Sequence, residues 1–290
     1  MRFVAGAVGV DEGAAAALVS RGAVYLGGRR CSDPRAKVSA GTMVTVVLEE
    51  AGRSTLEEAP PPPELRIVYE DEVLIAVDKP AGINAQPSPG RVGDSLADLV
   101  SAHLGRTAGL VHRLDKETSG ITVFGKSPKA TSALAAEFRE GGARKRYVAA
   151  CGPALPERGT IDLPLSKDPS RPGRFRATRA ANGVPAVTEY VRLHAAADHA
   201  LVALFPKTGR THQLRAHLAA LGAPIAGDKR YGGQPEVAGR TAERCLLHAQ
   251  ALAIAHPETR QLLLLEAALP SDLASVFAAD GVAPPGGPFP

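Results

Sequence analysis

Apolar residues in the middle and end of this chain gather in short runs that predict strands. The runs are rich in Val, Ile, Leu and aromatic residues and are bounded by Gly, Pro or charged turns, as is typical of strands in a sheet. They read LRIVYED, VLIAVD, GITVFGK, RYVAACG, AVTEYVRL, HALVALF, LLHAQALAIA and QLLLLEA. The larger part of the chain is therefore predicted to be built on a sheet.

Helical patterns are fewer and have clear ends. Ser127 and Pro128 supply the cap and first turn of a helix that runs through Phe138, and Gly141 lies just beyond it. A second helix is predicted from about His212 to Leu221, with its leucines on one stripe. Strands interrupted by separate helices, without regular alternation of the two, indicate the α+β class.

The beginning of the chain predicts a small α+β unit. DEGAAAALVSRG reads as a short helix closed by Gly22, and residues 24–26 and 38–48 read as short strands around a Gly-Gly turn. Pro60 to Pro63 cannot continue a helix or a central strand, so they indicate a boundary, although a Pro-rich loop inside one domain gives the same pattern. The predicted organisation is a small domain over residues 1–56, a linker over 57–65, a large domain over 66–280 and a disordered tail over 281–290.

Composition narrows the class of protein only a little. The chain has 290 residues, a net charge of +4 and a pI of about 9.0, which permits an anionic partner without requiring one. Its three cysteines are far apart and form no C-x-x-C pair, so neither a disulfide framework nor a thiolate zinc site is indicated. No segment has the roughly 20 apolar residues of a membrane helix. A cytoplasmic protein without a membrane segment is expected.

The stretch VHRLDKETSGIT, residues 111 to 122, places an acid beside two basic side chains in a loop before a strand. Asp115 is free to point into a cleft there, and His112 and Arg113 are placed to tune its charge. A turn carboxylate that bonds Thr118 or Ser119 is the structural alternative for the same spacing.

Two further stretches are basic. Arg144, Lys145 and Arg146 precede Tyr147 at the start of a strand, and an aromatic ring beside cations suits a nucleobase and its phosphate. The open segment at 167–179 is also basic and is able to follow a phosphate backbone; its cations are Lys167, Arg171, Arg174, Arg176 and Arg179. Solvated surface charge explains both stretches equally well.

The helix at 212–221 carries two histidines that invite a metal interpretation. His212 and His217 with Asp228 provide suitable ligand atoms. However, five residues of helix turn the two rings about 140° away from each other, which is unfavourable for chelation. No metal site is predicted.

Together these stretches resemble the RluA family of RNA pseudouridine synthases, in order from about Arg66 to Leu269. HRLDKETSG at 112–120 is similar to the family's catalytic loop, KRY at 145–147 to its Lys-x-Tyr element, and GRTHQLRAHLAALGAPIAGDKRYGG at 209–233 to its Gly-Arg-x-His-Gln motif. DKPAGI at 78–83, DLPLSKD at 162–168 and RCLLHA at 244–249 also match. One short match arises easily by chance, but several in the right order do not.

The N-terminal part resembles, in SRGAVYLGG and KVSAGTMVTVVLE, the RNA-binding domain named after ribosomal protein S-four. The basic first helix of that domain is replaced by MRFVAGAVGVDEG, and Gly27 stands where Asn is common, so a degenerate domain is expected. The overall resemblance implies a large mixed, mainly antiparallel β-sheet with flanking helices and a central active-site cleft.

The resemblance also implies roles for individual residues. Asp115 corresponds to the family's catalytic aspartate, Arg210 to the arginine that keeps it ionised, and Tyr147 to the ring that stacks on uracil. The implied RNA and substrate contacts are His112, Arg113, Thr118, Arg144, Lys145, Arg171, Arg174, Arg176, His212, Gln213 and Leu247. The reaction rearranges one nucleotide, so it needs no cofactor and no metal, and the expected partner is ribosomal or transfer RNA bound by a monomer.

Two other functions are compatible with parts of the pattern. A catalytically inactive RNA-binding protein on the same scaffold would keep the basic segments, and a metal-dependent hydrolase would use His212 and His217. The presence of all three catalytic residue types favours the pseudouridine synthase.

Overall fold

The computed structural model describes residues 2–20, 23–27, 29–31, 33, 35–39, 41–46, 63–87, 95–178, 183–287 and 289. Contacts between residues divide the chain into two compact units. The first comprises Met1–Glu64 and Asn84–Thr107, and the second comprises Leu65–Ile83 and Ala108–Pro290. Most of the linker predicted at 57–65 lies outside the described residues, so that boundary stays a prediction.

In its described residues, the first unit contains three helices and a small antiparallel sheet. Its helices are α1 (Arg2–Val8), α2 (Glu12–Ser20) and α3 (Leu96–Leu104), and its sheet has the order β2 (Arg29–Arg30), β1 (Val24–Leu26), β3 (Val44–Val46). The helix predicted from DEGAAAALVSRG is α2, and the strand predicted at 24–26 is β1. The strand predicted over 38–48 is confined, in the described residues, to β3. The sequence missed α1. Its Val4 packs with Leu18 and Val24 in a small apolar core.

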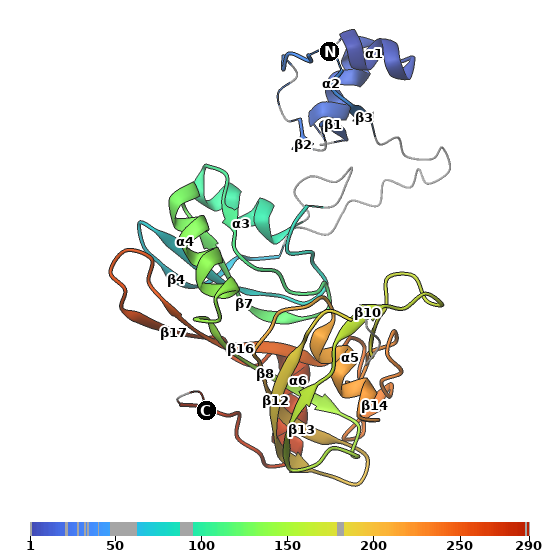
Figure 1. Ribbon diagram of the computed structural model, residues 1–290, viewed down its shortest axis with the longest axis vertical. Coiled ribbons are helices and arrows are strands. Elements are labelled where there is room, and N and C mark those ends of the chain that lie inside the picture. Colours follow the sequence, from blue (N-terminus) through green and yellow to red (C-terminus); the bar gives the residue numbers. More distant parts are fainter. Residues whose placement is uncertain are drawn as a thin grey trace. The chain divides into compact units, whose positions relative to one another are not determined.

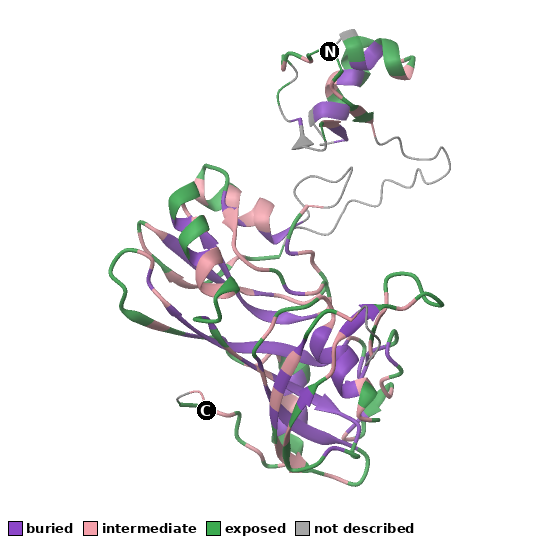
Figure 2. Ribbon diagram, in the orientation of Figure 1, coloured by how far each residue is buried: buried purple, intermediate pink, exposed green. Residues whose placement is uncertain are grey.

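A ten-stranded sheet dominates the second unit (Figure 1). Its main path is β4 (Arg66–Glu70), β5 (Leu74–Lys79), β7 (Ser119–Gly125), β16 (Leu247–Ala255), β8 (Arg144–Cys151), β13 (Ala200–Pro206), β12 (Val187–Ala195) and β9 (Arg158–Asp162). β17 (Leu262–Glu266) pairs with β16, and β6 (Gly109–Leu110) pairs with β7. Every strand that the apolar runs predict is present. β16 is buried almost throughout, as the purple central strands in Figure 2 show.

Three helices accompany this sheet: α4 (Pro128–Arg139), α5 (Gln213–Ala220) and α6 (Ser271–Ala279). The predicted start of α4 is confirmed, because the Ser127 side chain accepts a hydrogen bond from the backbone N–H of Ala130 and Pro128 occupies the first turn. α5 is one residue shorter at each end than its pattern indicates. α6 was not predicted; it buries Leu273 and Phe277. None of the helices in the described part of the chain has both the length and the apolar character needed to cross a membrane.

The tail predicted to be disordered makes specific contacts in the structure. The backbone carbonyl of Gly287 accepts a hydrogen bond of 2.9 Å from Arg146, and that of Pro285 accepts one of 2.8 Å from Gln250. Arg146 and Gln250 are buried, and buried donors require acceptors. The tail supplies those acceptors, which its Pro- and Gly-rich composition does not reveal.

The parallel pairing of β7 with β16 depends on Gly120. Its φ is +114°, and a Cβ added there would lie 2.2 Å from the backbone oxygen of Ala249. Gly120→Ala is therefore expected to lower the free energy of unfolding by about 3 kcal/mol, measured by urea titration. Gly286→Ala is the matched control, since a Cβ there meets nothing within 4 Å. Equal losses in the two variants would contradict the steric explanation.

Candidate active site

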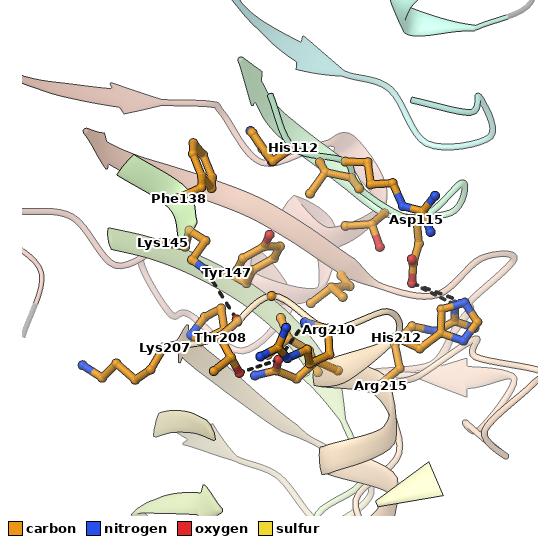
Figure 3. A pocket seen from close by; sticks show the side chains of 18 of the residues that line it. His112, Asp115, Phe138, Lys145, Tyr147, Lys207, Thr208, Arg210, His212 and Arg215 are labelled. Carbon is orange, nitrogen blue, oxygen red and sulfur yellow. Dashed lines mark hydrogen bonds and ion pairs between the residues drawn. The ribbon is translucent and has the colours of Figure 1, made fainter. Parts of the chain in front are cut away.

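One cavity of about 590 Å³ opens in the second unit where several predicted motifs meet (Figure 3). The loop before β7, the start of β8, the C-terminal part of α4 and the segment leading into α5 all contribute to its wall. The predicted site residues among its lining are His112, Arg113, Asp115, Thr118, Lys145, Tyr147, Arg210, His212, Gln213 and Leu247. The fold thus brings motifs that are far apart in sequence to one hollow.

The Asp115 loop, residues 111–118, is held in place through its backbone. The N–H of Thr118 donates to the carbonyl of Asp115 at 3.1 Å, which closes the turn. The ammonium of Lys79, fully buried, donates to the carbonyl of Lys116 at 3.1 Å, and the guanidinium of Arg244 donates to that of Glu117 at 3.0 Å. Burial lowers the pKa of Lys79 to about 8. Two basic side chains therefore fix the loop that presents Asp115.

The Asp115 carboxylate faces the guanidinium of Arg215. Its Oδ2 accepts a hydrogen bond of 3.0 Å from Nη1, and the Asp115 side chain is 26% exposed whereas that of Arg215 is 9% exposed. Arg215 also donates from Nε and Nη2 to the two oxygens of Asp228, at 2.7 and 2.8 Å. Burial opposes the charge on Arg215, but the hydrogen bonds and charge of Asp228, with Cys245 and Asp115 nearby, outweigh it and raise its pKa. The two hydrogen bonds to Asp228 thus orient the permanently charged guanidinium of Arg215 toward Asp115.

The prediction that Arg210 opposes Asp115 is wrong in its geometry. Arg210 has an exposed side chain, and its Nε donates to the carbonyl of Pro185 at 3.1 Å. It lines the cavity, but the chain turns at His212, where φ is +56°, before α5 begins. Because of that turn, Arg215 on the helix reaches the carboxylate instead.

Tyr147 and Lys145 point into the cavity from the same face of β8, since side chains alternate along a strand. Burial, with the charge of Asp115, raises the pKa of Tyr147. Burial also lowers the pKa of Lys145 to about 8, and its ammonium donates to the carbonyl of Thr208 at 3.4 Å. The phenol of Tyr147 therefore stays protonated. Lys145 is a cation at neutral pH, but it loses its proton more readily than an exposed lysine does.

Arg144 was predicted to contact substrate, but it belongs to the opposite face of β8. Its guanidinium carbon lies 5.6 Å from the ring centroid of Phe289, and that of Arg146 lies 5.4 Å from the same centroid. Arg146 also pairs with the carboxylate of Glu266 at 2.8 Å. The alternation of the strand separates these arginines from the cavity.

His112 and Gln213 line the cavity but already have partners within the protein. His112 accepts a hydrogen bond from the backbone of Val123 on Nε2 and stacks on Phe138 with centroids 4.4 Å apart. Burial, with the charge of Lys145, lowers the pKa of His112 to about 3, so the ring is neutral. The amide of Gln213 joins the segment before α5 to β12. Its partners are Thr208, Arg210, Val187 and Thr188. Both side chains shape the wall.

The remaining predicted contacts differ in position. Leu247 and Thr118 are buried in the wall, and His212 has its Nε2 3.8 Å from the Asp115 carboxylate. The described part of the basic segment at 167–179 belongs to a hairpin of β10 (Leu165–Lys167) and β11 (Phe175–Ala177), and Arg179 lies outside the described residues. Its described arginines, Arg171, Arg174 and Arg176, lie outside the cavity lining.

The metal interpretation of the helix finds no support in the contacts of His217. Its Nδ1 bonds the hydroxyl of Thr188 and its Nε2 bonds the carbonyl of Leu163, each at 2.9 Å, so both ring nitrogens are engaged. In the part of the chain that the structure describes, no three His, Cys, Asp or Glu side chains are grouped to hold a metal ion. Asp228, considered as a ligand from sequence, holds Arg215 instead.

Comparison with known proteins agrees with this arrangement of motifs. The model of the family described as RNA pseudouridylate synthase matches residues 73–220, which include Asp115, Tyr147 and Arg215. The chain belongs to the RNA pseudouridine synthase family. As a member it is an isomerase that acts on RNA, and the resemblance to the RluA type is confirmed.

Several relatives of this RNA pseudouridine synthase are similar over most of their length. The ribosomal large subunit pseudouridine synthase D of Nitrosomonas europaea is 34% identical, over 84% of this chain and 73% of that protein. An uncharacterized RNA pseudouridine synthase of Mycobacterium bovis is 37% identical, over 92% of this chain and 89% of that protein. The solved structure of human RNA pseudouridylate synthase domain containing 4 aligns with a TM-score of 0.63 and 27% identity, covering 76% of this chain and 95% of that one. These likenesses confirm the expected mainly antiparallel fold.

Proposed function

We propose that this enzyme converts uridines of large-subunit ribosomal RNA into pseudouridine, with Asp115 as the reacting carboxylate and with no cofactor. The observation that carries the proposal is the 3.0 Å pair of Asp115 and Arg215 in the cavity that Tyr147 also lines. Ribosomal RNA is favoured over transfer RNA because relatives from Nitrosomonas europaea and Neisseria meningitidis are ribosomal large subunit pseudouridine synthases.

The reaction is an internal rearrangement. The bond between C1′ of ribose and N1 of uracil breaks, the base rotates, and C1′ joins C5 of the same ring. The proton lost from C5 is balanced by one gained at N1, so no oxidant, reductant or outside atom enters. Asp115 either attacks C1′ or removes the proton on C2′, and each role needs an ionised carboxylate. Arg215 places a positive charge 3.0 Å from that carboxylate.

Tyr147 is proposed to stack on the detached uracil. Because burial and Asp115 raise its pKa, the phenol is protonated before the reaction. Its oxygen is able to take the C5 proton only if another group accepts the phenolic proton in the same step. Stacking on the base is therefore the role that the protonated state of the Tyr147 phenol supports most directly.

The target uridine has to leave its stack to reach Asp115, at a cost of a few kcal/mol. Arg113 is exposed beside Asp115 and lines the cavity, which suits a side chain that fills the vacated place. Lys145, inside the cavity, and the exposed Arg171 and Arg176 of the β10–β11 hairpin are proposed to hold phosphates. Such contacts weaken as salt concentration rises.

The proposal is tested with purified protein and RNA labelled with tritium at C5 of uridine. We expect tritium release from large-subunit ribosomal RNA without added metal or cofactor, and a single modified position or a few when that RNA is mapped. Transfer RNA transcripts serve as the competing substrate. Release from transfer RNA alone would refute the ribosomal assignment, and release from neither would refute the activity.

A further inference from the structure

Tyr231 is a buried residue of the GDKRYGG segment that has no part in the chemistry proposed above. It packs with Leu165 of β10 and Ala216 of α5 in one apolar cluster. Its backbone N–H donates to Oδ1 of Asp228 at 3.2 Å. The residue therefore lies where the basic hairpin, α5 and the carboxylate that holds Arg215 come together.

The ring of Tyr231 contacts one guanidinium from the hairpin and one from the active site. The guanidinium carbon of Arg174 lies 5.0 Å from the ring centroid, and that of Arg215 lies 5.1 Å from it. Both distances are within the range of cation–π attraction. Through Arg215, this ring is one side chain away from the Asp115 carboxylate.

The hydroxyl of Tyr231 makes a second pair of links. It accepts a hydrogen bond of 3.0 Å from the backbone N–H of Phe175 in β11, and it lies 3.1 Å from Nδ1 of His212. The other ring nitrogen of His212 is 3.8 Å from the Asp115 carboxylate. One phenol oxygen thus bridges the hairpin and the wall of the cavity.

A hairpin of two short strands has little stability of its own, so its position depends on what it packs against. Here Tyr231 supplies a hydrogen bond to β11 and a ring face to Arg174. We propose that Tyr231 is a positioning residue that couples the basic hairpin to the Asp115–Arg215 pair, so that RNA held on the hairpin aligns the carboxylate. This inference rests on the proposed function.

The first test is Tyr231→Phe, which keeps the ring and removes the hydroxyl that links β11 to His212. We expect the single-turnover rate on ribosomal RNA to fall about tenfold while the dissociation constant for RNA changes less than about twofold. Tyr190→Phe, at another buried tyrosine that does not line the cavity, is the matched control and is expected to keep the wild-type rate.

The second test measures coupling. Arg171→Gln with Arg176→Gln weakens the hairpin's hold on phosphate, and in the wild-type background it is expected to lower both RNA affinity and the single-turnover rate. In the Tyr231→Phe background the same pair should lower affinity alone. An unchanged rate in Tyr231→Phe, or an equal rate loss from the arginine pair in both backgrounds, would overturn the inference. If the wild-type protein releases no tritium, the proposed function itself fails; if it is active and only the coupling is missing, the inference alone fails.

Discussion

Asp115→Asn is expected to reduce pseudouridine formation by about 10³-fold or more. The amide has the size of the carboxylate but neither attacks C1′ nor takes a proton from C2′ at neutral pH. The fold should persist, because Arg215 keeps both hydrogen bonds to Asp228 and the loop is held through the backbone of Lys116 and Glu117. Tritium release measures the loss, and urea unfolding and RNA binding should remain close to wild type.

Glu117→Gln is the matched control for Asp115→Asn. It is the same change of acid to amide, two residues further along the loop, at a side chain that does not line the cavity. We expect it to retain activity within a few-fold of wild type. If Asp115→Asn keeps more than about a tenth of the wild-type rate, another group carries the reaction and the assignment of Asp115 is wrong.

The sheet was predictable because its strands are nearly continuous apolar runs between turn residues, as in β13 and β16. β9 was missed because its sequence, RGTID, has one large apolar residue, Ile161, and takes its register from β12. The sequence predicts an open loop where β10 and β11 form a hairpin, because proline and glycine are frequent in its turn. The signal for the start of α6 was Asp272, since an acidic side chain is favoured in the first turn of a helix.

In the candidate site, sequence patterns predict which face of a strand a side chain occupies but not which residues tertiary packing brings together. Strand alternation alone places Lys145 and Tyr147 on one face of β8 and Arg144 and Arg146 on the other, so the sequence is sufficient to place Arg144 away from the site. The sequence does not distinguish Arg210 from Arg215 as the partner of Asp115. The difference depends on the left-handed backbone at His212 and on Asp228, which lies 13 residues beyond Arg215 and is brought to it only by tertiary packing.

Arg215→Gln is expected to damage both stability and activity. It removes the charge opposite Asp115 and leaves the carboxylate of Asp228, whose side chain is 1% exposed, without its guanidinium partner. Loss of one member of a buried ion pair costs about 3–5 kcal/mol, so urea unfolding should shift by about that amount. The tritium-release rate should fall by about 100-fold or more even under conditions where the variant is folded. Arg210→Gln is the matched control, and its exposed side chain predicts a change in stability within about 0.5 kcal/mol.

A double variant separates the two effects of Arg215. Arg215→Met with Asp228→Asn removes both charges, while the asparagine oxygen still accepts from the backbone N–H groups of Arg230 and Tyr231. Because no buried charge is left unpaired, the double variant should recover most of the stability that Arg215→Gln loses. Activity should not recover, since Asp115 still lacks its cation. If stability and activity recovered together, Arg215 would matter only for folding. If Arg210→Gln lost more of the tritium-release rate than the double variant, the catalytic assignment would return to Arg210.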